Sequence, residues 1–408
     1  MASSLWIGTT GLAASEKQLG VIGNNLANAN TAGFKASDTS FACMLSQSAA
    51  SGSQRVGQGV TVSGIGTSFS QGSFQTTGNA TDMSIDGDGF FILKNTEGSI
   101  YYTRAGSFNV NESGLLADVS GYNVQGYKFI EGAGEVKEMV DLDLQNVMSK
   151  PKATEKFMIG LTLDSQTATN GTGTFDASQV IFDSLGTEHT LNITFTKVAT
   201  VGEWSVGYKL DGSSTTPAVT GSLTTITFDG ATGSIAGTVA DATIDLGALS
   251  SGATMGPLKW DLTSTEAKAK SITSFATTSR VNSVSNDGYS QGTLTGLSVN
   301  DSGIVEGMFS NGKRQSLARV LLASFGNNQG LNKVGSNFVP SGESGAAVIN
   351  NPGSGGVGTL RSNSLEMSNT DVAAEFIKMI MAQRAYQANA KVITSSDQML
   401  QQLMAIKQ

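Results

Sequence analysis

The segment TDVAAEFIKMIMAQRAYQANAKVITSSDQMLQQLMAI, residues 370–406, decides the fold of this chain. Steps of four and three residues through it meet mostly apolar side chains and alanine, which is the pattern of one face of an α-helix. Neither glycine nor proline interrupts the segment. Gln383 and Asp397 are polar breaks in the row. The side chains that we expect to pack are Val372, Phe376, Met379, Tyr386, Ile393, Leu400 and Met404.

A helix over this segment would be about 55 Å long, which exceeds the average for globular proteins. Ser368, Asn369 and Thr370 are predicted to cap its start, and Asp371 and Glu375 place negative charge near the positive end of the helix dipole. Because a compact body cannot cover an apolar row of this length, we expect another surface to cover it.

A second amphipathic helix is predicted over about residues 4–29. Its leucines recur every seven residues, and Ile22 lies on the neighbouring row. This spacing suits packing against another helix, although an ordinary surface helix docked on its own domain would show it too. The matching row at the other end of the chain favours an antiparallel pair of helices. The N-terminal residues that we expect to pack are Leu5, Leu12, Leu19, Ile22 and Leu26.

Residues 24–35 contain asparagines at positions 24, 25, 28 and 30 and are predicted to form a helix end and turn. Gly33 is expected in the left-handed conformation that ends helices. Residues 31–75 are polar and rich in Gly and Ser, and we predict a connecting region with one short strand near residues 59–66.

The rest of the sequence predicts a mainly β protein. Hairpin signals recur about every 8–12 residues from Gly78 onward, which indicates a sandwich or barrel. Residues 157–262 alternate between apolar and polar side chains, as in antiparallel sheets with one face exposed to water. The pattern of short strands and turns seen in residues 76–140 returns after Ser279. We therefore predict an outer β-domain at 141–279 inserted into a split β-domain, 76–140 and 280–368, flanked by a helical coiled-coil domain, 1–30 and 369–408.

Composition narrows the function. The chain has 408 residues, 50 of them glycine, a formal net charge of −8 and only 14% charged residues. The negative charge argues against a nucleic-acid partner, and no apolar run reaches the 18 or more residues of a membrane span. The first residues lack the pattern of a cleaved secretory signal, so a surface protein of this kind would need another export route.

A single cysteine and a single histidine exclude most catalytic and metal-binding constellations. Residues 353–358 match a dinucleotide-binding spacing but lack the strand and helix that it needs, so a flexible loop is favoured. Asp86–Gly89 is expected to be a hairpin turn and no calcium loop. His189 is expected on a strand surface, and Cys43 as a small packed side chain. We predict no enzyme activity and no cofactor.

Both ends of the chain resemble the bacterial flagellar rod and hook protein family. Residues 22–35, IGNNLANANTAGFK, are similar to its N-terminal signature, and residues 369–390 to its C-terminal signature. Residues 88–91 and 102–108 resemble its shared β-region, and residues 183–191 a segment of the hook members' inserted domain. The signature residues are Asn24, Asn25, Asn28, Gly33, Phe34, Gln383, Arg384 and Asn389.

The resemblance implies a structural subunit without catalytic activity. Hook members polymerise into a short curved tube, a universal joint that passes motor torque from rod to filament. The implied partners are further copies of the chain, the distal rod protein, the hook cap protein, the hook–filament junction protein and the flagellar type III export apparatus. The implied location is the extracellular hook and basal body of the flagellum, reached without a cleaved signal peptide.

Three alternatives remain at this point. Within the family, a distal rod-type protein with an enlarged insertion would share both signatures. An adhesin or carbohydrate-binding module would share the Gly- and Thr-rich β composition, but long helices at both ends are not expected there. A hydrolase built on acidic pairs is the remaining enzyme class. The length and the insertion at 141–279 together favour a hook subunit.

Overall fold

The structure is a computed structural model that describes residues 2–44, 57–130, 134–144, 147–169, 173–211, 220–236, 240–246, 253, 255–262 and 272–406. The chain divides into two compact units. The first unit comprises Met1–Asn146, Gly296–Gly307 and Gln315–Gln408, and the second comprises Val147–Thr295 and Met308–Arg314. The chain therefore leaves the first unit, builds most of the second and returns.

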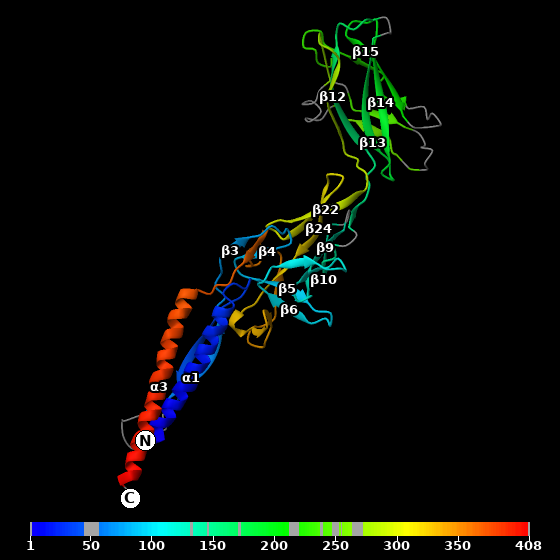
Figure 1. Ribbon diagram of the computed structural model, residues 1–408. Coiled ribbons are helices and arrows are strands. Elements are labelled where there is room, and N and C mark those ends of the chain that lie inside the picture. Colours follow the sequence, from blue (N-terminus) through cyan, green and yellow to red (C-terminus); the bar gives the residue numbers. More distant parts are fainter. Residues whose placement is uncertain are drawn as a thin grey trace. The chain divides into compact units, whose positions relative to one another are not determined.

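Two long helices of the first unit, α1 (Ala2–Ala27) and α3 (Val372–Ile406), lie side by side (Figure 1). They run antiparallel, as their contacts show. The hydroxyls of Ser4 and Ser396 share a hydrogen bond of 3.3 Å near one end, and Asn25 Nδ2 donates to Glu375 Oε2 at 3.2 Å near the other. The predicted antiparallel pair of terminal helices is confirmed.

The start of α3 differs from the prediction. Asp371 is the cap, because its Oδ1 accepts hydrogen bonds from the backbone N–H groups of Ala373 at 2.9 Å and Ala374 at 3.1 Å. The predicted caps Ser368 and Asn369 have other partners. Ser368 Oγ bonds to the Thr370 hydroxyl, and the Asn369 side chain binds backbone groups of the connecting region. The prediction of a cap among Ser368, Asn369 and Thr370 is therefore wrong, because Asp371, expected only to interact with the helix dipole, adopts the capping geometry.

Among its described residues, the connecting region holds a further strand that was not predicted. β1 (Ser37–Cys43) pairs antiparallel with β2 (Val60–Thr67), with a register shift between Ser40 and Phe41. Both strands contact α1. The second strand was missed because residues 37–43 have no clear alternation of apolar and polar side chains.

The remaining part of the first unit is a β-body in which early and late strands pair. β3 pairs with β30, β4 with β29, and β5 with β25, so the two flanks of the chain are hydrogen-bonded to each other. Its strands are β3 (Phe74–Thr76), β4 (Met83–Asp86), β5 (Phe90–Lys94), β6 (Ile100–Thr103), β7 (Phe108–Val110), β8 (Leu116–Asp118), β9 (Asn123–Ile130), β10 (Gly134–Asp141), β25 (Leu322–Ser324), β26 (Asn332–Val334), β27 (Asn337–Val339), β28 (Val348–Asn350), β29 (Thr359–Ser362) and β30 (Ser364–Glu366), with a short 3-10 helix, η1 (Asn328–Gly330).

Aromatic side chains form the core of this body. The Phe90 ring meets Phe69 and Phe338 with ring centroids 5.6 Å apart in each case, and Phe325 at 5.8 Å. These rings come from both flanks of the chain, so the core forms only when the flanks meet.

The second unit contains two sheets. One has the order β13-β14-β15-β17 and is antiparallel throughout. The other is mixed, because β12 runs parallel to β19 and β20 but antiparallel to β21. The strands of the second unit are β11 (Met148–Ser149), which pairs with β22 (Gly292–Val299) outside these two sheets, and β12 (Lys156–Asp164), β13 (Thr174–Phe182), β14 (Glu188–Lys197), β15 (Glu203–Leu210), β16 (Thr220–Gly221), β17 (Thr225–Thr227), β18 (Ala242–Asp245), β19 (Leu258–Trp260), β20 (Thr273–Phe275) and β21 (Arg280–Asn286). Strands β22, β23 (Ile304–Phe309) and β24 (Arg314–Val320) have residues in both units.

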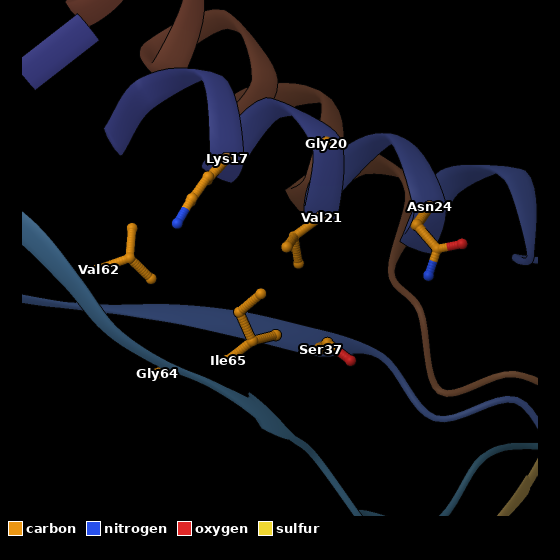
Figure 2. Close-up of a pocket in the computed structure, with 8 residues that line it drawn as sticks. All are labelled: Lys17, Gly20, Val21, Asn24, Ser37, Val62, Gly64 and Ile65. Carbon is orange, nitrogen blue, oxygen red and sulfur yellow. The ribbon is translucent and has the colours of Figure 1, made fainter. Parts of the chain in front are cut away.

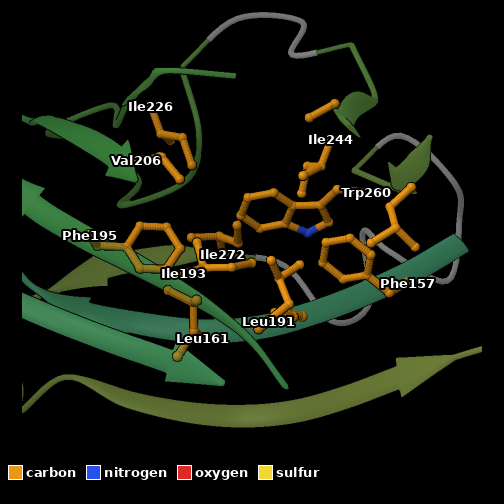
Figure 3. Packing of buried hydrophobic residues seen from close by; sticks show 14 of the residues in the cluster. Phe157, Leu161, Leu191, Ile193, Phe195, Val206, Ile226, Ile244, Trp260 and Ile272 are labelled. Carbon is orange, nitrogen blue, oxygen red and sulfur yellow. The ribbon is translucent and has the colours of Figure 1, made fainter. Parts of the chain in front are cut away.

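Large apolar side chains from both sheets fill the interior of this unit (Figure 3). Trp260 is fully buried and stacks on Phe157 with ring centroids 5.7 Å apart, while Phe195 meets it edge-on at 6.3 Å. The predicted fold class, mainly β with long terminal helices, is confirmed.

Removing the Trp260 ring should destabilise the second unit. We expect Trp260→Ala to lower the free energy of unfolding by about 3–5 kcal/mol, because it leaves a large cavity. Trp260→Phe should cost less, because the smaller ring still fills part of the space, and no hydrogen bond of the indole Nε1 is recorded among the described residues. Urea denaturation of the full chain, followed by the fluorescence of Trp204 in the same core, measures both. Val201→Ala is the control, because Val201 is 94% exposed, and an equal loss there would contradict this account.

Candidate assembly surface

The seam between α1 and α3 is built from small side chains. Gly8, Gly11 and Ala382 are buried in it. A Cβ added at Gly8 would lie 2.9 Å from a side-chain carbon of Ile393, and one at Gly11 would lie 2.7 Å from Nδ2 of Asn389. The helices approach closely because these positions lack side chains. Sequence reasoning missed this small-residue seam, because it followed the large apolar side chains.

The predicted packing residues divide into two groups. Ile22 is buried, and seven others are half-buried: Leu5, Leu12, Leu19, Leu26, Met379, Ile393 and Leu400. The other four are exposed in the single chain: Val372, Phe376, Tyr386 and Met404. The predicted row on α3 therefore lies half on the seam and half on open surface.

A further apolar face of α3 points away from α1 and was not singled out from the sequence. Ile377 is 60% exposed, Ile380 51% and Met381 65%. The spacing of these residues, together with Phe376, makes a continuous ridge on one side of the helix. A soluble monomer rarely exposes so many large apolar side chains together, so the ridge marks an interaction surface.

The asparagines after α1 fix the end of the helix pair. Asn25 is buried, where its Oδ1 accepts from the Ser37 N–H at 2.9 Å and its Nδ2 donates to the Ser37 carbonyl at 2.8 Å. Because Nδ2 also reaches Glu375, one side chain joins α1, β1 and α3. Asn28 Nδ2 donates to the Asn24 carbonyl at 2.9 Å and continues the turn. The Asn28 side chain thus binds a carbonyl at the helix end, while the Asn25 side chain attaches that end to β1 and α3.

Gly33 has the predicted left-handed conformation, with φ of +69°. The helix has already ended at Ala27, so Gly33 serves another purpose. A Cβ there would lie 2.3 Å from the backbone nitrogen of Ala105, which leaves no room for a side chain. Phe34 is buried beside it, and the Lys333 Nζ lies 4.0 Å from the centre of its ring. This turn therefore docks the helical pair on the β-body.

A buried ionic cluster lies beside the docked turn. Glu366, at the end of β30, accepts a hydrogen bond from Lys35 Nζ at 2.6 Å and contacts Arg104 Nη1 at 3.4 Å, and all three side chains are essentially inaccessible to solvent. The Gly72 N–H donates to the same carboxylate at 2.9 Å, and the Gly33 N–H donates to the Glu366 carbonyl at 2.7 Å. Four separate segments of chain thus meet at one residue.

Burial lowers the pKa of the Lys35 ammonium, although its bond to Glu366 acts in the opposite direction. Burial also lowers the pKa of Arg104, against the attraction of the same carboxylate. Removing water from two cations is unfavourable, and Glu366 is the anion that compensates for it. Sequence reasoning quoted Lys35 and Arg104 only as parts of motifs and missed Glu366, because nothing local in the sequence shows that it is buried.

A lysine joins α3 to β1, the first strand of the β1–β2 hairpin. Lys378 Nζ donates to Asp38 at 2.8 Å and to Glu375 at 2.9 Å. These hydrogen bonds, first to Asp38 and then to Glu375, raise the pKa of Lys378. The remaining signature residues of α3 lie elsewhere. Asn389 is half-buried against Gly11, while Gln383 and Arg384 are exposed.

The other motifs have structural positions. His189 lies on β14, where its Nε2 is 3.1 Å from the buried Asp183 carboxylate. The expectation that Cys43 is packed is wrong, because its side chain is exposed at the end of β1. Asp86–Gly89 forms the turn between β4 and β5. Across the described parts of the chain, no group of three or more His, Cys, Asp and Glu side chains could hold a metal ion. The described helices include none that is both long and apolar enough to cross a membrane.

Four family models match the chain. "Flagella basal body rod protein" matches residues 5–35, "Flagellar hook protein FlgE/F/G D1 domain" residues 84–187, "Flagellar basal body protein FlaE D2 domain" residues 154–289, and "Flagellar basal body rod FlgEFG protein C-terminal" residues 361–406. Both helices and both β-regions therefore contribute to the match.

Named relatives are similar over the full length. The "Flagellar hook protein FlgE" of Borreliella burgdorferi is 33% identical over 100% of both chains, and that of Escherichia coli is 31% identical over 98% of both. The crystal structure of the Helicobacter pylori flagellar hook protein FlgE2 is similar with a TM-score of 0.49 and 15% identity, covering 72% of this chain and 100% of that one.

Neutralising Glu366 should destabilise the joint between the helical pair and the β-body. We expect Glu366→Gln to lower the free energy of unfolding by about 3–5 kcal/mol, because two buried cations lose their counter-charge. Asp86→Asn is the matched control: it removes the exposed ion pair with Arg361 and should cost no more than about 1 kcal/mol. Chemical denaturation of the full-length variants measures the difference. Similar losses for the two variants would contradict the role of the cluster.

Proposed function

The chain belongs to the family of flagellar hook proteins, and we propose that it polymerises into a curved, flexible tube that passes motor torque from the rod to the filament. It is a structural subunit of the bacterial flagellar hook. Because its named relatives are components of a structure, we infer that the subunit works by assembly and not by catalysis.

The exposed apolar ridge on α3 is the observation that best supports polymerisation. Packing of each ridge against another copy would remove large side chains from water, at about 1.5–3 kcal/mol for each one fully buried. We propose that the four exposed predicted residues, Val372, Phe376, Tyr386 and Met404, lie in contacts between copies. The half-buried residues on α1 would then stabilise the pair and contribute their remaining surface to neighbours.

We further propose that the chain has four functional parts, with a helical coiled-coil domain at 1–30 and 369–408, a connecting region at 31–75, a split β-domain at 76–140 and 280–368, and an outer domain at 141–279. The pairing of early with late strands supports the split domain. The helical domains would line the tube, and the outer domain would make polar contacts that can slide as the tube bends.

The remaining partners follow from the position of a hook. We propose that the chain contacts the distal rod protein at one end of the tube, the hook–filament junction protein at the other, and the hook cap protein during growth. Export through the flagellar type III apparatus, without a cleaved signal peptide, would deliver it outside the cell. A rod-type axial protein with an enlarged insertion is the alternative within the family, and the full-length similarity to named hook proteins favours the hook.

Electron microscopy of the purified full-length protein under polymerising conditions tests the function. We expect curved tubes, because the exposed ridges make the monomer prone to ordered self-assembly. Straight tubes would favour the rod alternative. Protein that stays monomeric over a wide range of concentration and salt would contradict the proposed function.

Truncation of an exposed ring should separate assembly from folding. We expect Phe376→Ala and Tyr386→Ala to abolish tube formation while changing the free energy of unfolding by no more than about 0.5 kcal/mol, because these side chains are exposed in the single chain. Sedimentation measures assembly, and urea denaturation measures folding. Gln387→Ala, on the same exposed helix, is the control. Normal tubes from both ring variants would exclude these residues from the contact.

A further inference from the structure

A groove with a volume of about 640 Å³ lies between α1 and the β1–β2 hairpin (Figure 2). Its helix residues lie on a different face of α1 from the seam residues Gly8, Gly11 and Ile22. The hairpin supplies the opposite wall, and Ile65 there is 56% exposed. The lining residues are Lys17, Gly20, Val21, Asn24, Ser37, Val62, Gly64 and Ile65.

Four glycines in and beside the groove have no close neighbour within the single chain, and of these only Gly64 lies at the register shift between β1 and β2. A Cβ added at Gly20 or Gly23 of α1, or at Gly64 or Gly66 of β2, meets nothing within 4 Å. None of the four has the positive φ that requires glycine. A glycine inside a helix costs about 1 kcal/mol relative to alanine, and glycine also weakens a strand. The seam glycines, by contrast, are explained by the close approach of α3.

Glycine in a strand can mark a bulge, as at Gly64, or the close approach of another backbone. Gly20, Gly23 and Gly66 lie at no bulge, so they favour the close approach of another chain. The groove offers such a chain an apolar floor, formed by Val21, Val62 and Ile65 (Figure 2). An amphipathic helix lays residues spaced by three and four into a groove of this kind. The exposed ridge of α3 has that spacing in Ile377, Ile380 and Met381.

We propose that the groove receives the Ile377–Ile380–Met381 face of α3 from a second copy of the chain. The proposal rests on the proposed function, because it names the partner surface within the polymer. The ridge and the groove are different surfaces of the same molecule. Contacts between two different surfaces leave a free surface at each end, and such contacts build open helical polymers where a self-complementary contact would stop at a dimer.

Cysteine cross-linking tests the contact directly. In a Cys43→Ser parent, which has no other cysteine, Ile65→Cys and Ile380→Cys are introduced together, and assembled tubes are oxidised. We expect covalent dimers and higher ladders from the double variant and none from either single variant. Thr61→Cys with Ile380→Cys is the matched control. Thr61 is exposed on the same strand, and its side chain points to the opposite face from Val62.

The outcomes separate this contact from the function itself. Tubes that form without an Ile65–Ile380 cross-link overturn the contact and leave the proposed function intact. Cross-links from the Thr61 control equal to those from Ile65 overturn the contact as well. A Cys43→Ser parent that forms no tubes under any polymerising condition overturns the proposed function, and this contact with it.

Filling the groove gives a second, independent measurement. We expect Gly20→Leu to raise the concentration needed for tube formation by about tenfold or more, which corresponds to about 1.4 kcal/mol per contact. The unfolding midpoint of the monomer should not fall and should rise slightly, because leucine favours a helix more than glycine does and a Cβ at Gly20 meets nothing within 4 Å. Thr61→Leu adds similar bulk outside the groove and should change assembly less than about twofold. Unimpaired assembly of Gly20→Leu would overturn the contact.

Discussion

The buried carboxylate of Glu366 holds together parts of the chain that are far apart in sequence. It binds Lys35 from the turn after α1 and Arg104 from the β-body, and its own strand leads directly into α3. A carboxylate withdrawn from water is tolerated only when its partners are in place, so the cluster favours one arrangement of these segments over others. The contacts of this one residue therefore fix the positions of the start of α3, the end of α1 and the β-body relative to one another.

The helical pair has two kinds of surface, an internal seam and an exposed apolar face, and both depend on this arrangement. Small side chains on one side bring α1 and α3 close together, and large side chains on the other remain exposed. A chain that buried its large side chains internally would have nothing left for assembly. Placing Gly8 and Gly11 in the seam and Ile377 and Met381 outside it lets the same two helices fold as a pair and still present an apolar surface to other copies.

The sequence predicted the helices, their antiparallel pairing and the mainly β character, because these follow from periodicity along the chain. It also predicted the left-handed conformation of Gly33. It failed where the outcome depends on distant contacts. Asp371 caps α3 because Asn369 is already bound to the connecting region, and residues 37–43 form a strand because β2 and α1 lie beside them. Glu366 could not be identified, since its burial is created by segments hundreds of residues away in the chain.

The sequence by itself determined the two long helices, the mainly β character of the rest and the protein family that the chain resembles, because local periodicity and short motifs are properties of neighbouring residues. Only the tertiary structure decided which face of each helix is internal. Leu5 and Phe376 both belong to apolar rows with clear helical spacing, yet Leu5 is half-buried and Phe376 is exposed. The physical reason is that α1 and α3 can approach closely only where the side chains between them are small. Glycine and alanine therefore form the seam, and the larger residues face outward.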